Sequence, residues 1–204
     1  MQTKISVVVT NYNYGHFLSR CLRSLLDQTL PREQFEIIVV DDGSTDNSKQ
    51  VLALFGKETT QILLEKNFGL SHAANQALRK VKSRYVVRVD ADDFVHPNFL
   101  EQFLLGFELV GHTCEAVSCD YSKVLVDGTF AGYGSQLTEP IACGVAFKFE
   151  VFEFLGFYNE ELRIYEEVDF MERFTTAGFR IHHLNLPLYR YVQHGDSLTH
   201  GVFR

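Results

Sequence analysis

The first half of the chain alternates two patterns of apolar residues. Short, uninterrupted apolar runs are typical of parallel strands buried on both faces, whereas apolar residues that recur every three or four positions are typical of amphipathic helices. Strands are predicted at 5–10, 35–40, 62–64 and 85–89, and helices with apolar faces at 17–26, 51–55 and 73–81. Because strand and helix alternate, the connections are right-handed crossovers, and the pattern predicts a mostly parallel α/β sheet.

The second half of the chain has a more mixed pattern. Helices are predicted at 97–107 and 166–177, the latter closed by Gly178. Strands are predicted at 116–126, 129–133, 145–149, 179–184 and 188–193. The dipeptide Asp127-Gly128 is a strong hairpin signal between the first two of these strands. No repeat or long linker divides the sequence, so a single domain is expected over residues 1–204, with halves at 1–95 and 96–204.

Composition and charge narrow the class of protein. The 204 residues include 26 acidic and 19 basic side chains, a net charge of −7, which argues against a nucleic acid or an anionic membrane surface as the main partner. With 46% hydrophobic residues the chain is not a disordered sequence. No signal peptide and no apolar run of the ~18 residues that a membrane span needs is present. The expectation is a cytoplasmic protein with free thiols, and peripheral membrane association stays open.

Polar residues gather where three of the predicted strands end. The first strand leads into Thr10-Asn11-Tyr12-Asn13, the second into Asp41-Asp42 and the fourth into Asp90-Ala91-Asp92-Asp93. In an open parallel sheet, ligands bind outside the carboxyl ends of the strands. Five carboxylates at one edge repel each other unless a cation or hydrogen-bond donors neutralise them. Each aspartate alone is explained as well by a role as a helix cap as by ligand binding. Because one cap per helix is enough, the five aspartates together predict a ligand site.

Asp90 and Asp92 have a spacing that suits a divalent cation. Alternate residues of an extended chain face the same way, roughly 6.5 to 7 Å apart. One carboxylate can therefore hold an ion while the other reaches a neighbouring group such as a ribose hydroxyl. Oxygen ligands with open positions for phosphate suit Mg²⁺ or Mn²⁺. The D-x-D pattern is weak by itself and becomes informative because it follows a hydrophobic strand and has a second aspartate pair nearby.

Several motifs, taken in order, resemble those of a family 2 glycosyltransferase with a GT-A fold. The nucleotide-sugar half is matched by the segments 7–13, 39–46, 67–75 and 90–93, and the acceptor side by 156–160 and 166–170 together with Arg173 and Gly178. The resemblance covers nearly the whole chain. It implies a Rossmann-like, mostly parallel central sheet flanked by helices, with a smaller mixed acceptor-side region over 96–204.

The resemblance also implies donor-binding residues. Thr10, Tyr12, Asp41 and Asp42 match positions that hold the uracil and ribose of a UDP-sugar. Asn67 lies in the next donor-side motif, where a capped helix start is an equally good explanation.

Three further residues match positions around the ribose and the diphosphate. Asp90 matches the first aspartate of the D-x-D motif, near the ribose, and Asp92 matches the metal-binding one. His194 lies where some family members carry a histidine that joins the metal or the diphosphate. The implied cofactor is Mg²⁺ or Mn²⁺.

Glu167 matches the general base of the family, which is usually the aspartate of a Glu-Asp pair. Here the pair is Glu166-Glu167, and Glu166 or Asp169 are the alternatives. Without the other motifs, acidic residues at a helix N-terminus are better explained by the helix dipole. The phenylalanines at 147, 149, 152, 154 and 157 are interpreted as core, and Tyr133 in a Gly-rich loop as a candidate to stack on an acceptor.

The function predicted in this way is inverting, metal-assisted transfer of a sugar from a nucleotide-sugar, with UDP-sugar favoured. The acceptor would be a hydroxyl of a glycan, lipid-linked or protein substrate in polysaccharide, glycolipid or glycoprotein synthesis. One alternative is a catalytically inactive nucleotide-binding module of the same fold, supported only by the glutamate at the base position. Another is a sugar-nucleotide pyrophosphorylase, which would need a basic Gly-rich loop where residues 11–14 read Asn-Tyr-Asn-Tyr. The dinucleotide and P-loop motifs do not occur.

Overall fold

The first half of the chain forms the parallel part of one sheet. The computed structural model describes residues 3–162 and 165–195. Its first strands are β1 (Ile5–Asn11), β2 (Phe35–Asp41), β3 (Thr60–Leu63) and β4 (Tyr85–Asp90), which pair in parallel in the order β3-β2-β1-β4. The connections contain α1 (Gly15–Leu26), the 3₁₀ turn η1 (Arg32–Gln34), α2 (Ser48–Leu54) and α3 (Leu70–Leu78). The predicted parallel sheet is confirmed.

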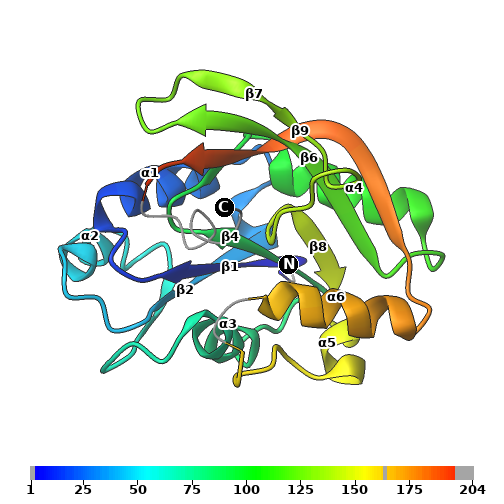
Figure 1. The fold of residues 1–204 in the computed structure, drawn as a ribbon, viewed down its shortest axis with the longest axis horizontal. Helices are drawn as coiled ribbons and strands as arrows, with labels where there is room; N and C mark the ends of the chain where they lie inside the picture. The colour runs from blue at the N-terminus through cyan, green and yellow to red at the C-terminus, as the bar shows by residue number, and fades with distance from the viewer. Residues whose placement is uncertain (1–2, 163–164, 196–204) are drawn as a thin grey trace.

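The second half extends this sheet with mixed pairing. Its strands are β5 (Phe94–Val95), β6 (Ala116–Leu125), β7 (Phe130–Gly134), β8 (Val145–Lys148) and β9 (Ile181–Gln193), and its helices are α4 (Phe99–Val110), α5 (Glu150–Leu155) and α6 (Glu166–Thr176). Strand β8 is antiparallel to both β4 and β6, and β9 runs parallel to β6, so the order across the described sheet is β3-β2-β1-β4-β8-β6-β9-β5. Figure 1 shows β6, β7 and β9 as a curved layer above the rest.

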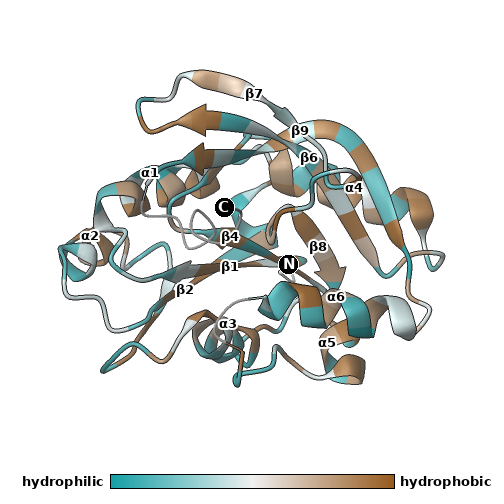
Figure 2. Cartoon of the chain, in the orientation of Figure 1, coloured by the Kyte–Doolittle hydropathy of each residue, from teal (hydrophilic) through white to brown (hydrophobic). Residues whose placement is uncertain are grey.

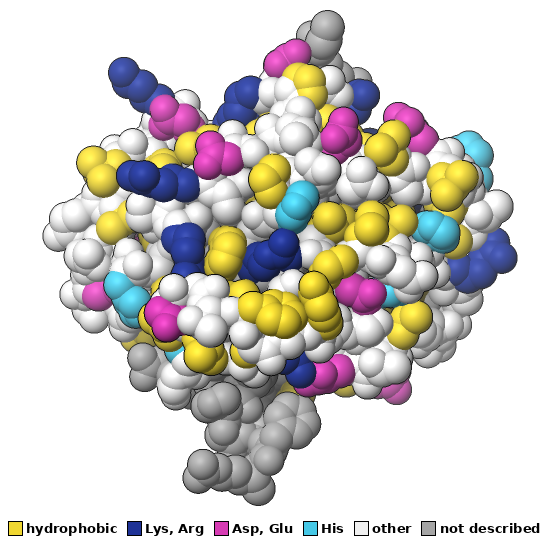
Figure 3. Space-filling model, turned by 90° about the horizontal axis from the view of Figure 1, so that it is seen from above, with side chains coloured by type: hydrophobic (Ala, Val, Ile, Leu, Met, Phe, Trp, Pro, Cys, Tyr) yellow, Lys and Arg dark blue, Asp and Glu magenta, His cyan; other side chains and the backbone are white. Residues whose placement is uncertain are grey.

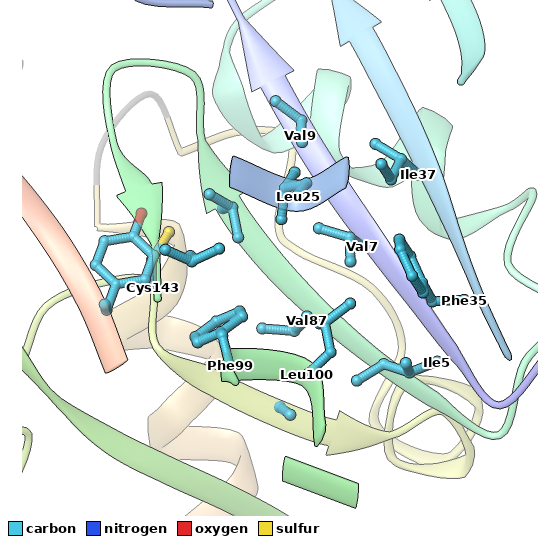
Figure 4. Close-up of a cluster of buried hydrophobic side chains, with 14 of the residues drawn as sticks. Ile5, Val7, Val9, Leu25, Phe35, Ile37, Val87, Phe99, Leu100 and Cys143 are labelled. Atoms are coloured by element: carbon cyan, nitrogen blue, oxygen red, sulfur yellow. The ribbon is translucent and has the colours of Figure 1, made fainter. Parts of the chain in front are cut away.

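Apolar side chains cover both faces of the sheet, which explains the uninterrupted apolar runs. On one face the odd-numbered residues of β1 pack against α1 and α4, and Figure 4 shows Val7, Val9 and Val87 near Leu25 and Phe99. On the other face, Val8, Ala74, Phe147, Phe152 and Phe170 belong to a second cluster with α3, α5 and α6. Figure 2 shows the apolar positions concentrated on the strands and on the inner sides of the helices.

Two local predictions differ from the structure, and two short elements were not predicted. The strands predicted at 179–184 and 188–193 are one strand, β9, whose register against β6 shifts around Asp120. Pro187 lies at this irregularity, and proline has no N–H to give to the ladder. Phe154, predicted as core, is 73% exposed. The short elements β5 and α5 have too few residues to produce a periodic pattern.

No helix among the described residues has the length and hydropathy needed to cross a membrane.

Candidate active site at the carboxyl edge of the sheet

Asp41 connects the loops that follow β1 and β2. Its Oδ1 accepts a hydrogen bond from Asn11 Nδ2 at 2.7 Å, and its Oδ2 accepts one from the Ser44 amide at 3.3 Å. The same Asn11 amide donates to Ser44 Oγ at 3.2 Å. Asp41 is fully buried, and these contacts bring its carboxylate the donors that a buried charge needs. Asp41 therefore holds the loops after β1 and β2 together, and its predicted contact with the nucleotide stays a prediction.

Asp42 holds the loop that leads into α3. Its two carboxylate oxygens accept the amides of Phe68 and Gly69, each at 2.8 Å. Gly43, with φ of +69°, lets this loop approach, because a Cβ there would lie 2.3 Å from the Lys66 carbonyl carbon. Asn67 is exposed within the same loop. The aspartate pair thus fixes the backbone around the edge of the sheet, on the side of β2.

Asp90 lies at the end of β4, where it meets β1 and a buried arginine. Thr10 Oγ1 donates to Asp90 Oδ1 at 3.4 Å, and Arg88 Nε lies 3.3 Å from the same oxygen. Arg88 Nη1 donates to Glu166 Oε1 at 2.9 Å. Burial opposes the charged form of Arg88, yet the surrounding acidic groups, including Asp90 and Glu166, hold its pKa well above the ordinary value. Arg88 therefore links the strand-end carboxylates to the start of α6.

Asp92 and His194 are adjacent although 102 residues separate them in the sequence. His194 Nε2 lies 2.8 Å from Asp92 Oδ2, and both side chains are largely buried. The imidazole packs edge-on to Tyr14 and against Phe17, with ring centroids 5.5 and 4.9 Å away. Arg20 donates to the Asp92 backbone carbonyl at 3.3 Å. The two residues predicted as metal ligands are thus brought together.

Asp93 has a structural role that the sequence pattern did not separate from the others. Its Oδ2 accepts the Tyr189 hydroxyl at 2.6 Å, and its Oδ1 accepts the Val192 amide at 2.8 Å. Burial raises the pKa of Asp93 well above its ordinary value, and the charges of Asp92 and Asp90 add to this effect. Asp93 therefore ties β9 to the loop after β4, which places His194 beside Asp92.

The acidic residues at the start of α6 divide into different roles. Glu166 is buried in its pair with Arg88, and Asp169 accepts two hydrogen bonds from Arg173, at 3.0 and 2.7 Å. Glu167 is half-buried and has no ion pair with a basic side chain of the described residues. Burial raises the pKa of Glu167, and the Glu166 charge raises it further. Of the three candidate bases, Glu167 is therefore the one without an ion pair to a basic side chain of the described residues, and its role as the base stays a prediction.

The donor atoms at this edge fit a divalent cation that is completed by a substrate. Asp92 presents a carboxylate oxygen, the ligand that Mg²⁺ and Mn²⁺ prefer, and His194 Nε2 lies 2.8 Å from that oxygen. His194 Nδ1 has no hydrogen-bond partner among the described residues. Those residues contain no group of three or more His, Cys, Asp and Glu side chains arranged to hold a metal. A cation at Asp92 and His194 therefore needs further ligands, such as phosphate oxygens.

Residues 6–184 match the family model described as glycosyl transferase family 2, so the chain belongs to this family. A chondroitin synthase of Pasteurella multocida is 28% identical over 207 aligned residues, which cover 96% of this chain and 21% of that protein. The chain thus spans about a fifth of the length of this curated relative. The family predicted from the sequence motifs is confirmed.

Solved structures establish the fold. TarS of S. aureus, residues 1–349 in complex with UDP, superposes with a TM-score of 0.79 at 23% identity, over 94% of this chain and 61% of that one. The mannosyltransferase PcManGT of Pyrobaculum calidifontis, in complex with GDP-Man and Mn²⁺, has a TM-score of 0.71 at 21% identity, over 95% of this chain and 57% of that one. The predicted GT-A fold is confirmed.

Proposed function

We propose that the chain catalyses inverting, metal-assisted transfer of a sugar from a UDP-sugar to a hydroxyl acceptor. The acceptor would be a glycan, lipid-linked or protein substrate in polysaccharide, glycolipid or glycoprotein synthesis. The observation that carries this proposal is the Arg88 bridge, which joins Asp90 at the donor edge to the acidic start of α6. Family membership supports the reaction class, and the UDP in TarS supports the choice of donor.

The donor nucleotide would bind across the ends of β2, β1 and β4. Thr10 and Asp90 lie at the ends of neighbouring strands, and Tyr12 is 42% exposed in the loop just beyond them. Asp41 and Asp42 would act on the nucleotide through the loops they hold. We infer this indirect role from their hydrogen bonds, because both carboxylate oxygens of Asp41 and of Asp42 already accept hydrogen bonds from the protein.

Asp92 and His194 are the residues that would hold Mg²⁺ or Mn²⁺. A cation bound there neutralises the negative charge that develops on the departing diphosphate. Tyr14 and Phe17 pack against the His194 ring, and Arg20 holds the Asp92 backbone in place. Asp93 fixes the position of β9, and this would hold the two proposed ligands in place before substrate binds.

Glu167 would be the general base. It would take the proton of the acceptor hydroxyl while that oxygen forms a bond to the anomeric carbon. The bond from this carbon to the diphosphate breaks, and its electron pair leaves with the nucleotide. A carboxylate whose pKa is raised is the stronger base for this step. The ion pair between Arg88 and Glu166 would set the position of Glu167 by fixing the first turn of α6.

The test is release of the nucleoside diphosphate by Glu167→Gln in the presence of Mn²⁺ and a glycan acceptor, measured as UDP from UDP-glucose or UDP-N-acetylglucosamine and as GDP from GDP-mannose. A base acts in the transition state more than in binding. We expect kcat to fall by ~10²-fold or more, with donor KM and the thermal shift caused by UDP nearly unchanged. Glu172→Gln, which removes an exposed carboxylate from the same helix, is the matched control and should keep full turnover.

Two other outcomes would redirect the proposal. If wild-type protein is stabilised by UDP and Mn²⁺ but releases no UDP or GDP above background with any donor, the inactive-module alternative holds. That alternative draws its support from glutamate standing where the family usually has aspartate. If Glu167→Gln keeps wild-type turnover, the base lies elsewhere and the mechanism loses its central residue.

A further inference from the structure

Two neighbouring residues of α1 bind the backbone of the D-x-D motif. Arg20 Nη2 donates a hydrogen bond to the Asp92 carbonyl oxygen at 3.3 Å, and Cys21 Sγ donates to the Asp90 carbonyl oxygen at 3.6 Å. A thiol is a weak donor, whereas a guanidinium is a charged donor, and hydrogen bonds from charged donors are the stronger ones in proteins. Of the two contacts, the one from Arg20 therefore holds the motif more firmly.

The same guanidinium also reaches the hairpin formed by β6 and β7. Arg20 Nη1 donates to the carbonyl oxygen of Val126, in the turn between the two strands, at 3.3 Å. This part of the hairpin is at the surface, because Val126 and Phe130 are 52% and 55% exposed. Figure 3 looks onto the layer of β6, β7 and β9 and shows apolar and basic side chains next to each other on that face. Arg20 is therefore anchored at one end on this turn while it holds the D-x-D motif at the other.

One of the aromatic rings that Arg20 contacts also packs against His194. The guanidinium carbon of Arg20 lies over the rings of Phe94 and Phe17, at 4.6 and 5.5 Å from their centroids. The centroid of the Phe17 ring lies 4.9 Å from that of the His194 imidazole. A cation over an aromatic face is attracted by the negative charge of that face. Arg20 thus contacts the surroundings of both proposed metal ligands, Asp92 through its carbonyl and His194 through Phe17.

Phe17 belongs to a small apolar cluster that is separate from the two clusters on the faces of the sheet. The cluster joins α1 to β5, β6 and β9, and its members are Phe17, Val124 and Val192, with Tyr14 and Phe94 packed against them. His194 follows Val192 by two residues in the chain, and its ring contacts those of Phe17 and Tyr14. The position of His194 therefore depends on this cluster, and Arg20 contacts two of its rings.

Packing alone does not explain why this position holds an arginine. Among the described residues Arg20 forms no ion pair with an acidic side chain, and its buried Nε atom has no hydrogen-bond partner. Taking a charged group out of water without an opposite charge costs free energy, and an unbranched apolar side chain would cover the same rings without that cost. The two hydrogen bonds to backbone carbonyls are therefore what Arg20 adds to the fold.

We propose that Arg20 is a positioning residue for the metal-binding pair of Asp92 and His194. The inference rests on the proposed function, in which these two residues hold Mg²⁺ or Mn²⁺. Arg20 does not touch the cation. It holds the main chain of Asp92 and the ring that packs against His194, so that the two ligands keep the relative position that a shared cation needs. Groups that orient metal ligands typically contribute roughly 10- to 100-fold to metal affinity.

The test measures the Mn²⁺ concentration that gives half of the Mn²⁺-dependent gain in Tm at a fixed concentration of UDP. Arg20→Met removes both hydrogen bonds and keeps an unbranched stem, and we expect the half-maximal Mn²⁺ concentration to rise about 10-fold or more. Arg20→Lys has one donor group in place of the two that Arg20 uses, so it should raise this concentration by less. The affinity for UDP in EDTA, measured by calorimetry, should be that of wild type in both variants. If Arg20→Met does not fold, Arg20→Lys still provides the test.

Arg23→Met and Gln28→Ala are matched controls on the same helix. Arg23 is exposed, and its replacement should leave the half-maximal Mn²⁺ concentration unchanged. Gln28 binds the backbone further along the same segment, because it donates to the His96 carbonyl and accepts the Leu100 amide, each at 2.9 Å. Gln28→Ala should therefore lower Tm without changing the half-maximal Mn²⁺ concentration. This control separates a loss of stability from a loss of metal affinity.

The inference is refuted if Arg20→Met has the half-maximal Mn²⁺ concentration of wild type. It is also refuted if Gln28→Ala raises this concentration as much as Arg20→Met does, or if Arg20→Met loses affinity for UDP in EDTA, since both results would reflect a general loosening of the site. These outcomes leave the proposed function standing, because wild-type protein still depends on Mn²⁺. If UDP stabilises wild-type protein equally in Mn²⁺ and in EDTA, the metal assistance in the proposed function fails, and this inference fails with it.

Discussion

Removing the Glu166 side chain should destabilise the protein through the charge it leaves behind. The Arg88 and Glu166 side chains are 6% and 2% exposed, and their atoms Nη1 and Oε1 are 2.9 Å apart. Breaking a buried ion pair by removing one partner costs about 3–5 kcal/mol. Because Asp90 remains 3.3 Å from Arg88 Nε, we expect Glu166→Ala to lose about 3 kcal/mol, the lower end of that range. In a chain of this length 1 kcal/mol moves Tm by about 2–4 °C, so Tm should fall by about 6–12 °C.

Thermal and urea unfolding at pH 7 measure this loss. Glu172→Ala, at an exposed position of the same helix, is the control and should change the free energy of unfolding by no more than about 0.5 kcal/mol. The double variant Arg88→Met/Glu166→Met should be more stable than the sum of the two single variants predicts, because it leaves neither charge unpaired. A Tm for Glu166→Ala within about 2 °C of the control would refute the reasoning. So would additive losses in the double variant.

Two further predictions concern the metal pair and a loop contact. Asp92→Ala should abolish the Mn²⁺-dependent part of the UDP thermal shift, and an unchanged difference between Mn²⁺ and EDTA would remove Asp92 from the metal site. A hydrogen bond from the Asn75 side-chain amide lowers the pKa of Glu160 from 4.5 to about 2. Burial opposes this shift, whereas His72 and Arg79 add to it. A lowered pKa adds stability above the unfolded value that is lost as the pH falls. The Tm deficit of Glu160→Gln should thus be present at pH 7 and disappear between pH 4.5 and about 2, whereas a deficit that persists at pH 2 would contradict this.

The strands were predictable where both of their faces are covered. β1, β2 and β4 are buried between helices on both sides, so their sequences are mostly apolar, a pattern that strands covered on one face only do not need. β9 was predicted as two strands because Pro187 interrupts its pattern. The structure carries the strand through this point by shifting its register against β6. That shift depends on the partner strand, which no local pattern contains.

The sequence placed the strand-end carboxylates together but did not separate their roles. Asp41, Asp42 and Asp93 each accept hydrogen bonds from protein donors that are distant in the sequence or lie on other loops. Only the fold supplies these donors, so the pattern could not distinguish a loop-holding aspartate from one that faces a ligand. Arg88 was missed, although a signal existed. It is a single charged residue inside an apolar strand that is covered on both faces, where a charge needs a partner.

The glutamate at the base position bears on whether the chain is an enzyme or an inactive module. Burial first, and the charge of Glu166 second, raise the pKa of Glu167, so its ionised form is disfavoured in the fold. A raised carboxyl pKa gives stability that is present below the unfolded value and lost as the pH rises. At neutral pH Glu167 therefore reduces stability, and Glu167→Gln should be at least as stable as wild type while it loses turnover. In a module that only binds nucleotide, the loss of stability at Glu167 would serve no purpose. In an enzyme, the raised pKa makes Glu167 a stronger base for taking the proton of the acceptor.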